Sequence, residues 1–236
     1  MSKNTKGFVL YQGPSMLDGS PVALIATLKS ANRKTGNMVQ TWIIRSDISP
    51  VEAVKSGCDA SICGDCPLRG NGQGKGRACY VNVGQAPGAV YRAYKAGKYD
   101  MDPGYFAIRQ ALHGRKLRVG AYGDPAAVPS DIWRVLTNWA DGHTGYTHQW
   151  RTADGLKGLV QASCDSEADA LLAYSKGWHY FRVTTNATTM LPNGERNCLA
   201  MLHPGKATCE TCGLCNGQRA NILIEAHGSG KKHHQG

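Results

Sequence analysis

The chain has 236 residues, and 27 lysines and arginines stand against 17 aspartates and glutamates, which gives a formal net charge of +10. A chain of this length can bury a large core, and we expect one domain over residues 1–236 because α/β barrels often run this long undivided. No apolar run approaches the length that crosses a bilayer, and the first residues lack the apolar segment of a signal peptide. The composition therefore predicts a soluble, cytoplasmic protein with no membrane partner.

The first 50 residues are predicted to form a small β extension. Segments 23–31 and 38–46 are rich in residues that favour strands, and the turn-prone segment 32–37 separates them. A short helix is expected next, because Ser49 is a good cap, Pro50 suits the first helical position and Gly57 ends the pattern.

Helices and strands are then expected to alternate. Alternation of this kind predicts βαβ units, and residues 51–228 are expected to form a partial (β/α)6-type TIM-like barrel with two cysteine-rich metal loops, in the α/β class. Residues 229–236 are predicted to be a disordered tail. The expected helices are 87–97, 103–114, 129–142 and 165–177, and the expected strands are 116–122, 145–150, 158–164, 179–186 and 220–228.

Polar residues follow the predicted strands, and in such barrels function gathers at the carboxyl ends of strands. Asp124, His148 and His227 are therefore candidate cofactor-binding residues. Each has a structural alternative: the carboxylate also suits the cap of the helix that follows, and each histidine also suits a hydrogen-bonded structural role.

Eight of the nine cysteines fall into two groups of four, and only Cys164, expected to pack as a small apolar residue, is left over. In a reducing cytosol such groups favour metal sites, whereas disulfides need a secreted context. Four thiolates match the ligand count of a tetrathiolate site. The first group, C-x4-C-x2-C-x12-C, is Cys58, Cys63, Cys66 and Cys79, and the second group, C-x10-C-x2-C-x2-C, is Cys198, Cys209, Cys212 and Cys215.

The C-x2-C-x2-C spacing of the second group resembles the cysteine runs of bacterial ferredoxins. Three ligands at this spacing can surround one corner of a cubane-shaped iron–sulfur cluster. Two zinc ions are the alternative, but a ribbon built from two C-x2-C pairs leaves four cysteines unexplained. The sequence thus favours two [4Fe-4S] clusters, both expected at one rim of the barrel. Cys79 and Cys198 lie farthest from their groups, and an exchange of ligands between the clusters stays open.

The first group lies one residue away from C-x3-C-x2-C and precedes the βα units, an order that resembles radical S-adenosylmethionine enzymes over residues 38–228. The resemblance implies an S-adenosylmethionine site. In it Asp124, in "GAYGDP", would correspond to the carboxylate of the acidic glycine-rich turn with which the family helps to hold the methionine group. The pattern departs from the family in two ways. One extra residue follows Cys58, and the thiolate of Cys79 would occupy the coordination position on iron that S-adenosylmethionine needs. The "CY" pair at Cys79 also resembles uncharacterised cysteine-rich proteins encoded by phages, which implies the cytoplasm of a bacterial host.

Residues 67–98 carry six basic and no acidic side chains, with tyrosines interleaved. This composition predicts a surface for nucleic acid or another polyanion, on which the tyrosines stack with bases. The alternative is a solvated helix face whose tyrosines pack inward. The residues are Arg69, Lys75, Arg77, Arg92, Lys95 and Lys98, with Tyr80, Tyr91 and Tyr94.

Three functions follow from these patterns. The first is an iron–sulfur protein that transfers electrons to a redox partner or acts on an anionic substrate. The second is a non-catalytic protein whose zinc ions or clusters brace a nucleic-acid-binding surface. The third is a true radical S-adenosylmethionine enzyme with Cys79 off the cluster. The sequence names no catalytic residue and leaves open whether the protein is an enzyme.

Overall fold

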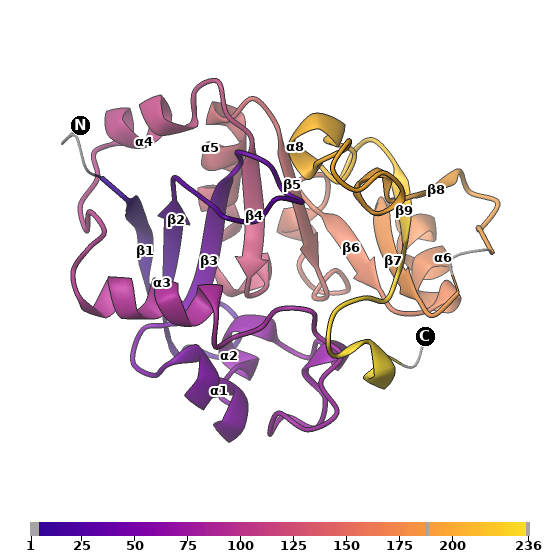
Figure 1. Ribbon diagram of the computed structural model, residues 1–236, viewed down its shortest axis with the longest axis horizontal. Helices are drawn as coiled ribbons and strands as arrows, with labels where there is room; N and C mark the ends of the chain where they lie inside the picture. Colours follow the sequence, from indigo (N-terminus) through magenta and orange to yellow (C-terminus); the bar gives the residue numbers. More distant parts are fainter. Residues whose placement is uncertain (1–4, 187–188, 235–236) are drawn as a thin grey trace.

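The computed structural model describes residues 5–186 and 189–234, which form a mixed α/β fold on a nine-stranded sheet (Figure 1). The strand order is β1-β2-β3-β4-β5-β6-β7-β9-β8. The strands are β1 (Gly7–Pro14), β2 (Pro21–Thr27), β3 (Val39–Arg45), β4 (Leu117–Tyr122), β5 (His143–Thr147), β6 (Gln161–Cys164), β7 (Tyr180–Thr184), β8 (Glu195–Asn197) and β9 (Asn221–Glu225). The α-helices are α1 (Pro50–Ser56), α2 (Ala60–Cys63), α3 (Ala86–Lys95), α4 (Tyr105–Leu112), α5 (Ser130–Trp139), α6 (Glu167–Ser175), α7 (Leu199–Leu202) and α8 (Cys209–Cys212).

The N-terminal part of the sheet is an antiparallel meander of β1, β2 and β3. The predicted strands in 23–31 and 38–46 are confirmed as β2 and β3, which are almost fully buried. The strand β1 is not among the segments that the sequence predicts. Its apolar run, residues 8–11, is short, and the half from Leu10 onward is only partly buried, unlike its two neighbours.

The remaining strands run parallel to β3, with β9 inserted between β7 and β8. In Figure 1 the arrowheads of β4 and β6 point to the lower edge, where α1, α2 and the C-terminal segment lie, whereas α8 lies at the upper edge. The two cysteine groups therefore lie toward opposite ends of the parallel strands. The prediction of a single rim is wrong, because α8 packs beside the segments that precede β3 and β4.

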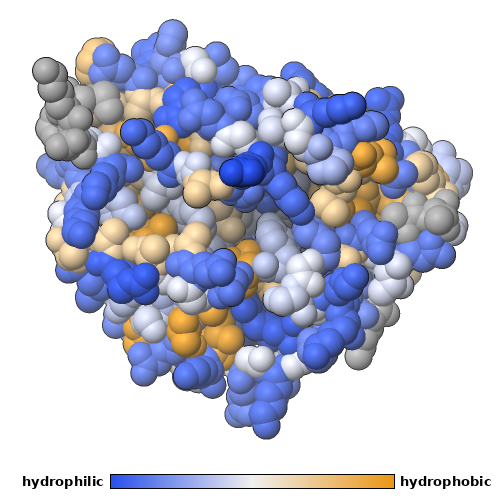
Figure 2. Space-filling model, in the orientation of Figure 1, coloured by the Kyte–Doolittle hydropathy of each residue, from blue (hydrophilic) through white to orange (hydrophobic). Residues whose placement is uncertain are grey.

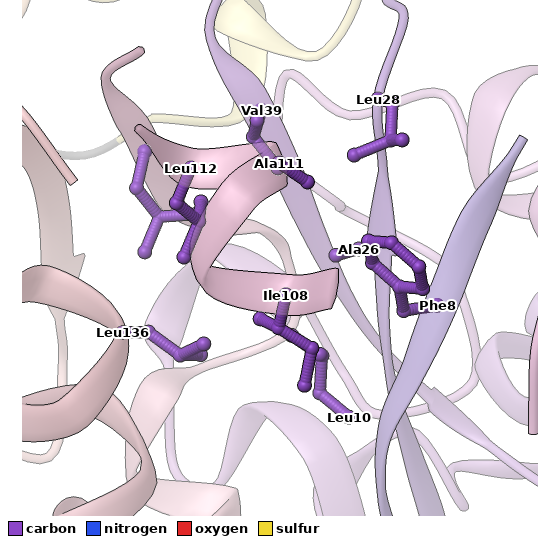
Figure 3. A pocket seen from close by; sticks show the side chains of 10 residues that line it. Phe8, Leu10, Ala26, Leu28, Val39, Ile108, Ala111, Leu112 and Leu136 are labelled. Carbon is purple, nitrogen blue, oxygen red and sulfur yellow. The ribbon is translucent and has the colours of Figure 1, made fainter. Parts of the chain in front are cut away.

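Helices cover the sheet where their apolar sides meet it. In α5 the buried side chains are Trp133 and Leu136, and the Trp133 indole donates a hydrogen bond of 2.9 Å to the Pro125 carbonyl. Figure 3 shows Ile108 and Leu112 of α4 directed toward the first strands, around a pocket lined only by apolar side chains. This pocket is a gap between packed side chains of the core, and it presents no polar group to a ligand.

The helix α1 begins and ends where its sequence predicts. The Ser49 hydroxyl accepts a hydrogen bond of 3.2 Å from the Glu52 amide, Pro50 is the first helical residue, and Gly57 follows with a left-handed φ of 79°. A Cβ on Gly57 would lie 2.6 Å from the Gly72 carbonyl oxygen, so glycine lets the following loop fold back on the helix. The first cysteine comes directly after this turn.

A buried ion pair holds the far edge of the sheet. The Arg182 guanidinium of β7 donates to both carboxylate oxygens of Glu195 in β8, at 2.8 and 2.7 Å, and both side chains are nearly inaccessible. In the tail, Lys231–His233 form a 3-10 turn (η4) against the first cysteine loop, while residues 235–236 of the predicted disordered tail lie outside the described residues. In the described ranges no helix combines the length and the apolar character that a bilayer crossing requires.

Candidate metal centres

The first cysteine loop is folded by its own polar groups. The Arg69 guanidinium donates to the carbonyls of Gly57 and Gly64, both at 2.9 Å, and to the buried Asp59 carboxylate at 2.6 Å. The Cys79 amide donates to the Leu68 carbonyl at 3.0 Å, which closes the loop. Arg69, predicted as part of a polyanion surface, is thus engaged inside the loop.

The thiols of Cys63, Cys66 and Cys79 face one another. Burial raises the pKa of the Cys63 thiol well above its usual value, and the neighbouring Cys66 and Cys79 raise it further. Burial also raises the pKa of Cys79, although Arg77 opposes the shift. The Cys63 and Cys79 thiols are therefore protonated in the metal-free protein, and a metal must displace their protons to bind.

Cys58, the first cysteine of this group, follows directly after the turn at Gly57. The Arg45 guanidinium has the Cys58 thiol among its charged neighbours. The strongest electrostatic neighbours of Cys63 are Cys66, Cys79, Asp59 and Asp124, and Cys58 is not one of them. The prediction that Cys58 is a ligand stays a prediction.

His148 is brought to the first group by the loop after β5. Its ring hydrogen-bonds Cys66 on one side, and its Nε2 lies 3.1 Å from Oδ2 of Asp165 on the other. Burial opposes protonation of the ring, but Cys66 and Asp165 outweigh it and raise the pKa of His148 well above its usual value. Asp165 follows β6, and no sequence pattern marks it, because its partner lies 17 residues away.

Asp124 serves as a cap and a clamp. Its Oδ1 accepts hydrogen bonds from the Ala126 amide at 2.9 Å and the Thr147 hydroxyl at 2.7 Å, and its Oδ2 accepts one from the His148 amide at 2.8 Å. Burial raises the pKa of Asp124, and these hydrogen bonds oppose that shift. The predicted cap of the following helix is wrong, because Asp124 caps the 3-10 turn Pro125–Ala127 and Pro129 precedes α5, and the carboxylate also places His148.

The second group converges from two segments. Burial raises the pKa of the Cys198 thiol, and Cys209 and Cys212 raise it further. Burial also raises the pKa of Cys215 to about 12, against a hydrogen bond from the Tyr146 phenol. Cys215 in turn has Cys198 and Cys209 as neighbours, so all four thiols belong to one cluster of side chains.

Backbone hydrogen bonds fix the second group on the sheet. The Cys209 amide donates to the Lys34 carbonyl at 2.8 Å, the Cys198 amide donates to the Leu223 carbonyl at 2.9 Å, and the Cys215 carbonyl accepts from the Gly145 amide at 3.0 Å. Thr208 caps α8 through a capping box. These hydrogen bonds attach the cysteine segments to parts of the chain in or near three different strands.

A buried arginine lies beside the second group. Arg118 of β4 is only 5% exposed, and its guanidinium carbon lies 4.5 Å from the centre of the Tyr146 ring. Its hydrogen-bond partners are the Thr144 hydroxyl at 3.3 Å and the Tyr80 hydroxyl at 3.4 Å, and its Nε has no partner. Within residues 5–186 and 189–234 no carboxylate forms an ion pair with it, whereas the Cys209 and Cys215 thiols are electrostatic neighbours. No sequence motif identifies Arg118 as a site residue, because its importance comes from its burial in the folded protein.

His227 and most of the basic segment lie apart from the thiols. The His227 ring stacks on Tyr80, with 5.5 Å between ring centres and 22° between planes. Tyr91 and Tyr94 pack against the core, and the Tyr91 hydroxyl donates to the Asp47 carbonyl. Tyr80 is therefore the one of the three predicted stacking tyrosines that is largely exposed. Figure 2 shows a mostly hydrophilic face on which apolar side chains form separate patches.

A cavity of about 580 Å³ opens beside the first group, between the glycine-rich loop and the C-terminal turn. Lys75, His233 and His234 give it basic groups, and Asp165 gives it the acidic group that also contacts His148. The other lining residues are Pro67, Leu68, Gly70, Asn71, Gly76 and Ala78.

No three histidine, cysteine, aspartate or glutamate side chains of the described residues are spaced to hold a single metal ion. One zinc ion bound at about 2.3 Å would draw four sulfurs to about 3.8 Å from one another. A four-iron cluster surrounds its core with thiolates that stand farther apart. Comparisons with protein-family models, with curated proteins and with solved structures find no match for this chain.

Proposed function

We propose that the chain is an iron–sulfur protein in which the two cysteine groups each hold a [4Fe-4S] cluster on a partial TIM-like barrel, and that it transfers electrons. The observation that supports this most is Arg118, a buried guanidinium beside the second group. The seven parallel strands and the helices between them support the barrel as the scaffold.

A buried guanidinium without an anion is costly. Arginine stays charged in proteins, and an uncompensated charge costs several kcal/mol even after relaxation. Tyr146 faces Arg118 with a neutral phenol, since burial raises the pKa of Tyr146 well above its usual value. A cluster held by four thiolates has net negative charge, and it would supply the counter-charge that Arg118 lacks.

The donor chemistry of the first group also fits a cluster. Cys63, Cys66 and Cys79 are close to one another, largely enclosed, and next to the cavity through which a partner or substrate would approach. Thiolates are the ligands that iron–sulfur clusters use. Arg69 also neutralises Asp59 beside the thiols.

The two groups are connected through the interior. Tyr80 follows Cys79 and accepts a hydrogen bond from Arg118, which lies over Tyr146, and Tyr146 donates to Cys215. When bound, a four-iron cluster supplies one-electron exchange. The side chains of this chain would set its potential: the phenol of Tyr146 and the charge of Arg118 both stabilise added negative charge at the second group.

The cavity beside the first group supports a second candidate, chemistry on an anionic substrate. Lys75 and His233 provide cationic side chains, and the loop glycines allow a phosphate to approach the backbone. A labelled single-stranded oligonucleotide and pyrophosphate test it. Salt-sensitive binding that Lys75→Ala weakens would favour this candidate, and equal affinity in both proteins would count against it.

Iron and acid-labile sulfide analysis of anaerobically purified protein tests the proposed function. Two cubanes predict about eight iron atoms and eight sulfides per chain, with a signal in electron paramagnetic resonance after reduction. Cys212→Ala should remove about half of the iron. Two zinc ions and no sulfide in a colourless protein would overturn the proposal in favour of a zinc-braced protein. Cleavage of S-adenosylmethionine by the reduced protein would identify a radical enzyme.

A further inference from the structure

The helix α6 carries its large apolar side chains on its outer face. It packs on β6 and β7, and the side chains that it buries are those of Ala170 and Ala173. Leu171, Leu172 and Tyr174 are 46%, 43% and 47% exposed. A surface helix ordinarily turns its apolar stripe toward the core and its polar face toward solvent. We propose that this outer face is the contact between two copies of the chain, an inference that goes beyond the proposed function and does not depend on it.

The exposed side chains of α6 form a stripe that suits a second helix. Residues three and four positions apart lie on one face of a helix, so Ala168, Leu171 and Ser175 follow one another along the stripe, and Leu172 widens it. All four are exposed. A central leucine between two small residues lets a facing helix approach closely, because the distance between helix axes depends on the side chains at the contact.

A two-fold axis between Leu171 and Leu172 pairs the stripe with itself. In a dimer of this symmetry the same patch is used on both copies, and the two α6 helices run antiparallel. Leu171 of one copy then lies opposite Leu172 of the other. Ala168 lies opposite Ser175, so the small residues meet on both sides of the leucines.

The charges at the ends of α6 specify the antiparallel direction. Glu167 is the first residue of the helix and its side chain is 55% exposed, and Lys176 follows the last residue and is exposed. Nine residues of helix separate them by about 13.5 Å. The two-fold axis brings Glu167 of each copy to Lys176 of the other, whereas a parallel alignment would bring like charges together. Antiparallel helix dipoles favour the same direction.

The same features argue for a second copy over other partners. A nucleic acid or an anionic membrane needs a basic surface, but one end of this stripe carries the carboxylates of Glu167 and Asp169. Three half-exposed side chains supply less than the about 800 Å² per partner that stable interfaces bury. We therefore expect a weak dimer whose population rises with protein concentration.

Sedimentation equilibrium of the full chain between about 5 and 200 μM tests the dimer, because small interfaces give weak association. The average mass of the wild type should rise from that of one chain toward that of two. Leu171→Gln combined with Leu172→Gln should raise the dissociation constant about tenfold or more, and glutamine preserves the helix because its propensity is close to that of leucine. Val135→Gln, at an exposed position on α5, is the matched control and should associate as the wild type does.

Two results would overturn the inference. A wild type that keeps the mass of one chain throughout this range would leave the face of α6 to a different protein. Equal association of the wild type and the double leucine variant would place the dimer contact elsewhere on the chain. Neither result bears on the metal content of the protein, which is measured separately.

A charge exchange tests the direction of the helices. Lys176→Glu and Glu167→Lys should each weaken association, because each variant brings like charges together at both ends of the pair. An equimolar mixture of the two variants should associate at least as well as the wild type, since each mixed dimer then has opposite charges at both ends. Urea unfolding of each variant alone checks that it is folded. A mixture that associates no better than either variant alone would contradict the antiparallel pairing.

Discussion

The guanidinium of Arg118 lies over the ring of Tyr146, with 4.5 Å from its central carbon to the ring centre. The Tyr146 phenol in turn neighbours the Cys215 thiol, so the buried positive charge beside the second group is coupled to one of its thiols. Arg118→Met should lower the reduction potential of the second cluster, because the reduced form loses a stabilising charge. A loss of about 1.4 kcal/mol corresponds to about 59 mV for a one-electron couple. A redox titration followed by electron paramagnetic resonance measures the shift.

Arg134→Met is the matched control for the loss of one positive charge. Arg134 lies on α5, and its side chain is 53% exposed, so solvent screens its charge. The reduction potential of the second cluster in Arg134→Met should equal that in the wild type. An unchanged potential in Arg118→Met, with iron content preserved, would show that Arg118 does not act on the cluster.

The Arg182–Glu195 pair predicts a large loss of stability. Glu195→Gln leaves the buried Arg182 guanidinium with only the exposed Glu167 carboxylate, at 3.4 Å, as its counter-charge, and breaking a buried pair costs about 3–5 kcal/mol. Urea unfolding at neutral pH measures the change. Asp131→Asn, which removes an exposed ion pair of 3.7 Å, should leave the midpoint nearly unchanged. Equal midpoints for the two variants would contradict the prediction.

The sequence predicts most of the elements because their signals are local. The caps of α1 at Ser49 and Gly57 and the buried runs of β2 and β3 each depend on neighbouring residues. The strand β8 has three residues and no apolar run, and it is stable because Glu195 reaches Arg182. On α5 the packing of the core selects Trp133 and Leu136 as the buried side chains, whereas the apolar Val135 is 39% exposed.

The candidate site is predicted where it depends on spacing and missed where it depends on packing. Close cysteines such as Cys209 and Cys212 are grouped by the sequence and lie together in the structure. Arg118 and Asp165 acquire their roles from contacts with residues that lie 28 and 17 positions away, at Tyr146 and His148. The strand order and the opposite placement of the two groups are also tertiary properties.

Metal removal should loosen one part of the chain more than the rest. The helices α7 and α8 have four residues each, and α8 has no buried residue, so their position depends on the second cysteine group. Anaerobic chelation should therefore increase amide exchange in 198–216, while β2 and β3 stay protected by the core. Hydrogen exchange followed by mass spectrometry measures both segments. Uniform loss of protection, or none, would contradict this expectation.

His143 predicts a loss of stability in acid. Its Nε2 donates to the carbonyls of Leu159 at 2.8 Å and Asn216 at 3.2 Å, which joins β5 to the loop after Cys215. Burial lowers the pKa of His143 below its usual 6.5, the two carbonyls oppose the shift, and Arg219 adds to it. The folded state thus prefers the neutral ring, so its contribution is complete above pH 6.5 and is lost as the pH falls through the lowered value. Unfolding free energies measured from pH 7.5 downward should fall more steeply in the wild type than in His143→Gln. Parallel curves for the two proteins would show that the ring titrates alike in the folded and unfolded chain.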